Sequence, residues 1–128
     1  MVSLDDVARI ALDLPEVTEG PRHGNRSWSV DGKAFAWERP FSKADVKRFG
    51  TASPPEGPIL ATRIDDLVEK AAVLAANPVA FFTIPHFDNF PAVLIQLPVV
   101  TSRALRDAVL DGWLACAPER LTEAYRDR

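Results

Sequence analysis

The stretch Arg26–Pro40, RSWSVDGKAFAWERP, decides the fold. Asp31-Gly32 at its centre predicts a two-residue type I′ turn, because both central residues of that turn need positive φ and this pair tolerates it well. Such a turn joins two antiparallel strands and sets their register. The predicted pairs are Val30 with Lys33, Trp28 with Phe35, and Arg26 with Trp37. We therefore expect the large side chains to share one face of the hairpin, toward the core.

A helix is predicted before this hairpin. Ser3 can cap it, and Asp6 stands three residues later in the capping-box position, near the positive end of the helix dipole. Pro15 ends it, since proline interrupts helical hydrogen bonding. The apolar residues between them recur at helical spacing: Val7, Ile10, Ala11 and Leu14. The residues from 17 to 25, VTEGPRHGN, are predicted to form a polar loop.

After the hairpin, a loop rich in proline is predicted, followed by a second set of helices and strands. The predicted elements are a helical turn Lys43–Phe49 capped by Ser42, a strand in ILATRI (59–64), a helix Asp65–Ala76 with Leu67, Ala71 and Leu74 inward, two strands in FFTIPHFDNFPAVLIQLP (81–98), a helix from Thr101 or Ser102 to Cys116, and a helix Pro118–Tyr125. Helices that stand between hairpins favour an α+β fold over a doubly wound one. We predict one domain, 1–128, with an antiparallel sheet of about five strands, including two hairpins, and helices packed on one face.

The composition is that of a soluble globular protein. Apolar residues make up 47% and charged residues 26% of the 128, which is enough for a core that needs no staples. The single cysteine, Cys116, excludes an intramolecular disulfide and fits a reducing compartment. The acidic start of the chain and the lack of a long apolar run predict a cytoplasmic protein that makes no use of a membrane.

Charge is unevenly spread along the chain. The net charge is −3, yet residues 22–48 carry +4 and the remainder −7. This asymmetry permits one basic face on an acidic protein, although scattered lysines and arginines are usually only a solvated surface.

The residue types that carry catalysis or bind metals form no complete motif. His23 and His86 are 63 residues apart and match no zinc spacing, so no metal or cofactor is implied. Cys116 falls on an apolar helical stripe, where a cysteine behaves as a small hydrophobe. The paired acids at 5–6 and 65–66 suit helix N-termini. GPRHGN could hold an anion, but it lacks a phosphate-loop spacing. No catalytic residue is proposed, and enzymatic activity is the lowest-ranked of the possible functions.

The stretch Phe81–Pro98 contains the remaining cluster of polar residues. Asp88-Asn89 supplies turn chemistry between Pro85 and Pro91, because both side chains can bond their own backbone. Val93, Ile95 and Leu97 alternate toward the core, and Leu94 indicates that the other face is partly covered too. His86 is the member that a turn does not need, so its replacement by alanine should leave folding nearly unchanged.

The chain resembles the MmcQ/YjbR family of small bacterial proteins. The resemblance rests on ALDLPEVTEG, HGNRSWSVDGKAFAWE, FFTIPHFDNFPAVLIQL and LRDAVLDGWLACAPERL, and covers roughly residues 3–122. It implies a CyaY-like α+β fold, sometimes described as a double wing, and a DNA-binding role that rests on the shape of that fold. It brings no catalytic residues.

Two functions remain open. In the first, the hairpin and its flanking loops bind DNA phosphates; the candidate residues are Arg22, His23, Arg26, Lys33, Arg39, Lys43, Lys47 and Arg48. In the second, a monomer or homodimer binds a small molecule or another protein in a pocket with aromatic walls; the candidates, expected to be exposed, are His23, Trp28, Trp37, His86, Asp88 and Asn89.

Overall fold

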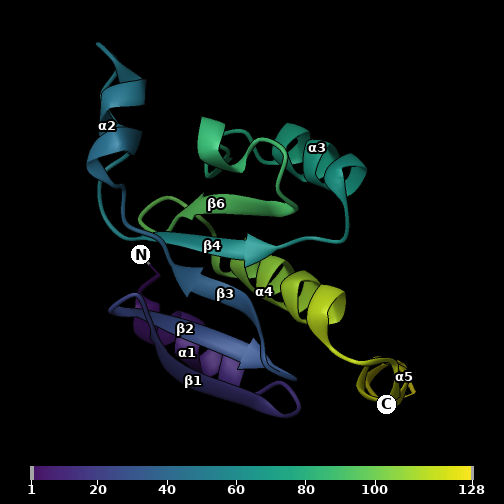
Figure 1. The fold of residues 1–128 in the computed structure, drawn as a ribbon. Helices are drawn as coiled ribbons and strands as arrows, with labels where there is room; N and C mark the ends of the chain where they lie inside the picture. The colour runs from purple at the N-terminus through teal and green to yellow at the C-terminus, as the bar shows by residue number, and fades with distance from the viewer. Residues whose placement is uncertain (1, 128) are drawn as a thin grey trace.

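The computed structural model describes residues 2–127, and these residues form an antiparallel sheet with helices packed against it (Figure 1). The elements in chain order are α1 (Leu4–Leu12), β1 (Val17–Arg22), β2 (Asn25–Val30), β3 (Lys33–Glu38), α2 (Lys43–Phe49), β4 (Ile59–Arg63), α3 (Leu67–Ala76), β5 (Phe81–Phe82), the 3-10 helix η1 (Pro85–Phe87), β6 (Ala92–Gln96), α4 (Ser102–Cys116) and α5 (Glu119–Arg126). The strands lie in the order β1-β2-β3-β4-β6-β5, and every neighbouring pair is antiparallel. The predicted α+β class is therefore confirmed.

The sheet has six strands among the described residues, because the expected loop at 17–25 is a strand and a turn. β1 pairs with β2 along its full length, from Val17 opposite Val30 to Arg22 opposite Asn25. His23 and Gly24 form the turn with φ of 52° and 78°, which is the conformation of a type I′ hairpin. A proline inside the strand is tolerated because β1 is the sheet edge.

The register predicted for the β2–β3 hairpin is right at the turn and wrong beyond it. Val30 pairs with Lys33 and Ser29 with Ala34, but Trp28 then pairs with Ala36, so a β-bulge leaves Phe35 without a partner. An extra residue in one strand reverses the faces of all residues after it. Trp37 therefore points to the face opposite Trp28, and the large side chains do not share one face.

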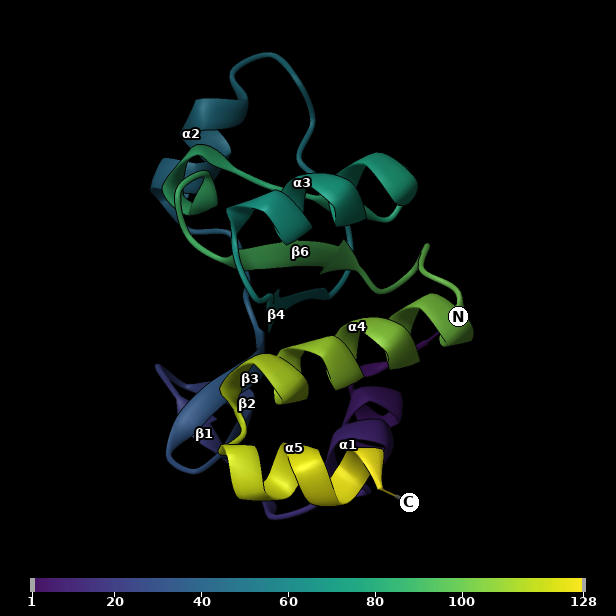
Figure 2. The same ribbon diagram turned by 90° about the vertical axis from the view of Figure 1, so that its right-hand side faces the viewer.

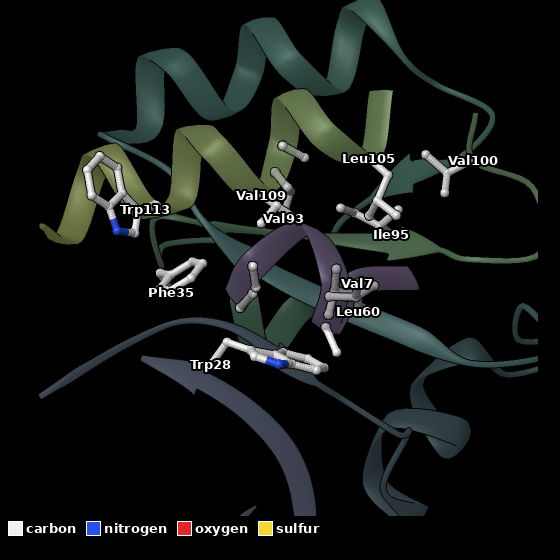
Figure 3. Packing of buried hydrophobic residues seen from close by; sticks show 14 of the residues in the cluster. Val7, Trp28, Phe35, Leu60, Val93, Ile95, Val100, Leu105, Val109 and Trp113 are labelled. Atoms are coloured by element: carbon white, nitrogen blue, oxygen red, sulfur yellow. The ribbon is translucent and has the colours of Figure 1, made fainter. Parts of the chain in front are cut away.

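The two faces of the sheet each cover an apolar cluster. The larger cluster includes Trp28, Phe35, Leu60 and Trp113, and lies between the sheet and the helices α1 and α4 (Figure 3). The smaller one lies on the other face, where Ile59 and Leu94 meet the 3-10 helix and the aromatic residues that flank α2. Alternation along β6 produces both, because Val93, Ile95 and Leu97 belong to the larger cluster and Ala92 and Leu94 to the smaller, as the sequence predicted.

The helices begin where their caps predict. The Ser3–Asp6 capping box starts α1, and the Ser42–Asp45 box starts α2. In Figure 2, α1, α4 and α5 are gathered together and α3 lies beside β6. No helix of residues 2–127 is long and apolar enough to cross a membrane.

The predicted inward face of α3 is right for Leu74, which is partly buried against the larger cluster, and wrong for its other two members. Leu67 and Ala71 are exposed, while Lys70 is 4% exposed. Its aliphatic stem crosses an apolar interior, and its ammonium reaches two backbone carbonyls. Hydrophobic spacing alone does not predict a buried lysine, because the carbonyls that satisfy it lie 17 and 20 residues away.

Candidate functional site

A pocket of about 450 Å³ opens at the sheet edge where β1 turns into β2 and β3 ends. This volume lies within the range of roughly 300–1,000 Å³ that small-molecule sites occupy. Its lining combines aromatic walls with cationic and imidazole groups: Arg22, His23, Asn25, Trp37, Glu38, Arg39, Pro40, His86, Phe87 and Phe90.

The aromatic rings of the pocket form a connected row. Trp37 and Phe87 have ring centroids 6.4 Å apart, and Phe87 and Phe90 meet edge to face at 5.7 Å. Guanidinium groups lie over two of these rings, Arg22 at 5.5 Å from the Trp37 centroid and Arg39 at 5.5 Å from that of Phe87. The pocket therefore offers flat apolar faces next to positive charge, which suits a ligand with a ring and an anionic group.

The β-bulge at Phe35 places Trp37 in this pocket. Without the extra residue, Trp37 would point to the same side as Trp28, into the larger core. Asn25 and Ser27 lie on the same face of β2 as Trp37 because they alternate with Trp28 along the strand. Arg22, opposite Asn25 on β1, extends across this face to the Trp37 ring.

Lys70 holds the loop that forms the opposite wall. Its ammonium donates to the backbone carbonyl of Phe87 and, at 3.0 Å, to that of Phe90. Burial lowers the pKa of Lys70, and the nearby Asp88 carboxylate opposes this effect. Arg63 supports the same loop, since its Nε donates to Pro91 O at 3.1 Å and its guanidinium lies over the Phe90 ring.

Asp45 attaches α2 to the pocket. Its carboxylate accepts from Arg39 at 2.9 Å and from the Ser42 backbone at 2.9 Å, and its side chain is 2% exposed. Burial raises the pKa of Asp45, but the hydrogen bonds from Ser42 and Arg39 together outweigh it, so the pKa lies below its usual value. Arg39 is thus fixed between Asp45 and the Phe87 ring.

The structure divides the eight candidate nucleic-acid residues into groups. Arg22, His23 and Arg39 line the pocket, and Lys43, Lys47 and Arg48 are exposed on α2, which the Arg39–Asp45 ion pair joins to it. Arg26 is paired with Glu19 at 3.0 Å and with Asp5 at 2.8 Å. Lys33 stands at the other end of β2–β3, opposite Val30 and about 13 Å along the strand from Arg26.

The six candidate ligand residues also separate. His23, Trp37 and His86 line the same pocket, although the two histidines are 63 residues apart in the sequence. Asp88 and Asn89 do not line it, and the Asp88 carboxylate accepts instead from Thr83 Oγ1 at 3.3 Å. Trp28 was expected to be exposed, which is wrong: its indole is fully buried and donates to Glu19 at 2.9 Å.

The sequence analysis did not select Phe87 and Phe90 as pocket residues. In an apolar run, a phenylalanine usually belongs to the core, and Phe87 does pack there with one edge toward the pocket. The one signal that points to Phe90 is its position after Asp88-Asn89 in a loop, where a large apolar side chain has no structural requirement.

The single cysteine and the arrangement of metal-ligating residue types can also be compared with their predictions. Cys116 is buried, as the sequence predicted, and burial raises the pKa of its thiol above the usual value. Among residues 2–127, no three His, Cys, Asp or Glu side chains are arranged to hold a metal ion. The pocket itself offers aromatic rings, two arginines, two imidazoles and the carboxylate of Glu38, which can recognise a ligand by charge and shape.

Comparison with known proteins places the chain in a group of uncharacterised proteins. No protein-family model matches it. The crystal structure of Deinococcus radiodurans protein DR2400, a DUF419 domain, matches with a TM-score of 0.67 over 99% of this chain and 87% of that one, at 16% identity, which shows a shared fold. Uncharacterised proteins Mb2600 of Mycobacterium bovis and MT2646 and Rv2570 of Mycobacterium tuberculosis are each 40% identical over 127 residues, 98% of this chain and 96% of theirs. The chain therefore belongs to the family of these mycobacterial proteins.

Proposed function

We propose that this protein binds DNA without catalysing a reaction. The contact surface lies at the β1–β2 turn, the end of β3 and the exposed side of α2. We call it the cationic edge and define it by six residues: Arg22, His23, Arg39, Lys43, Lys47 and Arg48. The observation that carries the proposal is the gathering of six of the eight basic candidates on this edge, next to a pocket with aromatic walls. A local basic surface can bind phosphates even when the whole protein is acidic.

The basic residues of the cationic edge differ in whether an ion pair already engages their charge. Arg22 takes part in none of the ion pairs among residues 2–127, and neither do Lys43 and Lys47. Arg48 has only a long contact of 3.9 Å to Asp45. The strongest phosphate contacts are therefore expected from these four side chains, and Arg26 and Lys33 are expected to contribute little.

The resemblance to MmcQ/YjbR proteins supports the same proposal, because proteins of that family are labelled as DNA-binding on the basis of fold. A DNA partner places the protein in the cytoplasm, where the single thiol of Cys116 would stay reduced. We include membership of the MmcQ/YjbR family in this proposal.

Fluorescence anisotropy with a labelled oligonucleotide tests DNA binding. Each phosphate contact should add a slope of about −0.7 to −0.9 to the dependence of log K on log salt. Lys47→Ala should lower this slope by about one contact, and Lys33→Ala, a matched exposed lysine away from the edge, should leave it unchanged. A dissociation constant weaker than about 10⁻⁵ M at low salt for every DNA tested would end the proposal.

A small-molecule role is the second candidate, because the pocket volume of about 450 Å³ suits a ligand of metabolite size. A ring with an acidic group would contact Trp37 and Arg22 together. A thermal-shift screen of aromatic acids and nucleotides tests this role, since a ligand present at 100 times its Kd stabilises by roughly 2.7 kcal/mol. If a compound raises the Tm of the Trp37→Ala protein as much as that of the parent, its binding site lies outside this pocket.

A further inference from the structure

We infer that the pocket holds one unstacked base of a single strand, so that this protein prefers single-stranded to double-stranded DNA. This inference rests on the proposed function and specifies its substrate class. It has three supports, which are the ring geometry of the pocket, the position of β2–β3 within the sheet, and the cations of the cationic edge that take part in no ion pair among residues 2–127.

The ring geometry suits a base face. Trp37 is half-buried and lines the pocket, and Phe90, which also lines it, is 40% exposed. Single-strand binding proteins stack bases on such aromatic side chains and on guanidinium planes, of which Arg22 over Trp37 is one. In a duplex the base faces are covered by neighbouring bases, and only the base edges and backbone are open to a protein.

The β2–β3 hairpin, which was expected to act as a wing, cannot enter a groove of duplex DNA. β1 flanks β2 and β4 flanks β3, so both strands are internal to the sheet. A major groove admits a free helix or a free two-stranded ribbon, roughly 12 Å wide at its mouth. The β2–β3 turn carries Asp31 and Lys33, whose charges cancel, while the cationic edge lies at the other end of the strands.

The cations of the cationic edge can contact the phosphates that flank a stacked base. Arg22, the last residue of β1, lines the pocket, and Lys43 and Lys47 are exposed on α2, which the Arg39–Asp45 ion pair joins to the pocket. The pocket wall that carries Phe87 and Phe90 is held in place before binding, because Lys70 and Arg63 bond the backbone of its loop. A preformed wall of this kind lowers the ordering cost of binding.

Tryptophan fluorescence of the unmodified protein is the first test. Trp28 and Trp113 are fully buried, and Trp37 is the third tryptophan of the chain, so quenching by DNA reports on the pocket. A short single strand of mixed sequence should quench this fluorescence and bind at least tenfold more tightly than the same sequence as a duplex, as measured by anisotropy at about 50 mM salt.

Variants then separate stacking from charge. Trp37→Ala should weaken single-strand binding about 5- to 150-fold, which is the range that one stacked base provides, and Trp37→Phe should restore most of it. Phe90→Ala, at a position that is 40% exposed, should weaken it in the same direction, and urea unfolding checks that this variant is folded. Duplex affinity should not change in any of the three, and Lys33→Ala should alter neither affinity.

The outcomes distinguish the inference from the proposed function. Equal or tighter duplex binding, or Trp37→Ala and Phe90→Ala proteins that bind the single strand normally, would overturn the base pocket and leave DNA binding standing. If the protein binds neither single-stranded nor double-stranded DNA, the inference and the proposed function are both wrong. If adenosine monophosphate alone fills the pocket and an oligonucleotide does not compete with it, the inference is wrong and the small-molecule role is favoured.

Discussion

Gly112 lies at the closest approach of α4 to the sheet, and its replacement by alanine tests the packing of the whole fold. A Cβ at this position would lie 2.8 Å from the carbonyl oxygen of Phe35 and 3.3 Å from that of Arg63. Both atoms belong to the backbone of central strands, so no side chain can rotate away to make room. The added methyl group must push α4 off the sheet.

Two opposing effects determine the result. Overpacking costs about 1–3 kcal/mol, and the upper end applies here because the obstacle is backbone. Alanine in a helix interior regains about 1 kcal/mol over glycine. We therefore expect Gly112→Ala to lower the free energy of unfolding by about 2 kcal/mol, which for a domain of this size corresponds to a fall in Tm of roughly 6–10 °C.

Urea unfolding followed by circular dichroism measures this change, and Gly20→Ala is the matched control. Gly20 has ordinary backbone angles, and a Cβ added there would meet no atom within 4 Å, so alanine should change stability by no more than about 0.5 kcal/mol. A Gly112→Ala protein as stable as the parent would mean that helix propensity outweighs the clash. It would refute the close packing of α4 on β3 and β4.

Four further predictions follow from single residues. Asp45→Asn should destabilise by about 2–4 kcal/mol at pH 7, because it removes the buried negative charge that pairs with Arg39. The low pKa of Asp45 means that the contribution of this charge disappears as pH falls below 3.8, so urea unfolding of the two proteins should converge there. Lys70→Met should cost about 1–3 kcal/mol by removing the ammonium's hydrogen bonds to the carbonyls of Phe87 and Phe90, which keep their backbone donors. Since burial lowers the lysine's pKa, the unfolded state binds more protons just below pH 10.5, and parent stability should rise with pH there relative to the variant's. His86→Ala should change stability by less than about 0.5 kcal/mol in the same assay yet weaken DNA binding. A thiol reagent should label Cys116 only as fast as the protein opens, and rapid labelling would contradict its burial.

Local interactions made much of the fold predictable. A capping box is complete within four residues, which is why Ser3 and Ser42 correctly mark the starts of α1 and α2. The apolar spacing of α4 was equally reliable, since Leu105, Val109 and Trp113 are all fully buried. In each case the decisive contacts lie within the element or on one continuous apolar face.

Predictions failed where distant partners decide the structure. β1 has an exposed, proline-containing sequence, and only its hydrogen bonds to β2 make it a strand. Likewise, no residue near Lys70 in the sequence reveals the carbonyls of Phe87 and Phe90 that allow its burial. The pocket depends on such partners as well, because the turn at His23 and the loop at His86 meet only through the order of the strands.

The bulge at Phe35 links the core to the candidate site. Phe35 and Ala36 are both fully buried in the larger cluster, which two successive residues of a regular strand would not be. The same irregularity presents the Phe35 carbonyl to Gly112 and turns Trp37 to the opposite face. A regular hairpin would have placed both tryptophans in the core and left the pocket without its main ring. The close packing of α4 and the aromatic wall of the pocket therefore depend on one extra residue in β3, so the register of that hairpin determines both the packing of the core and the shape of the pocket.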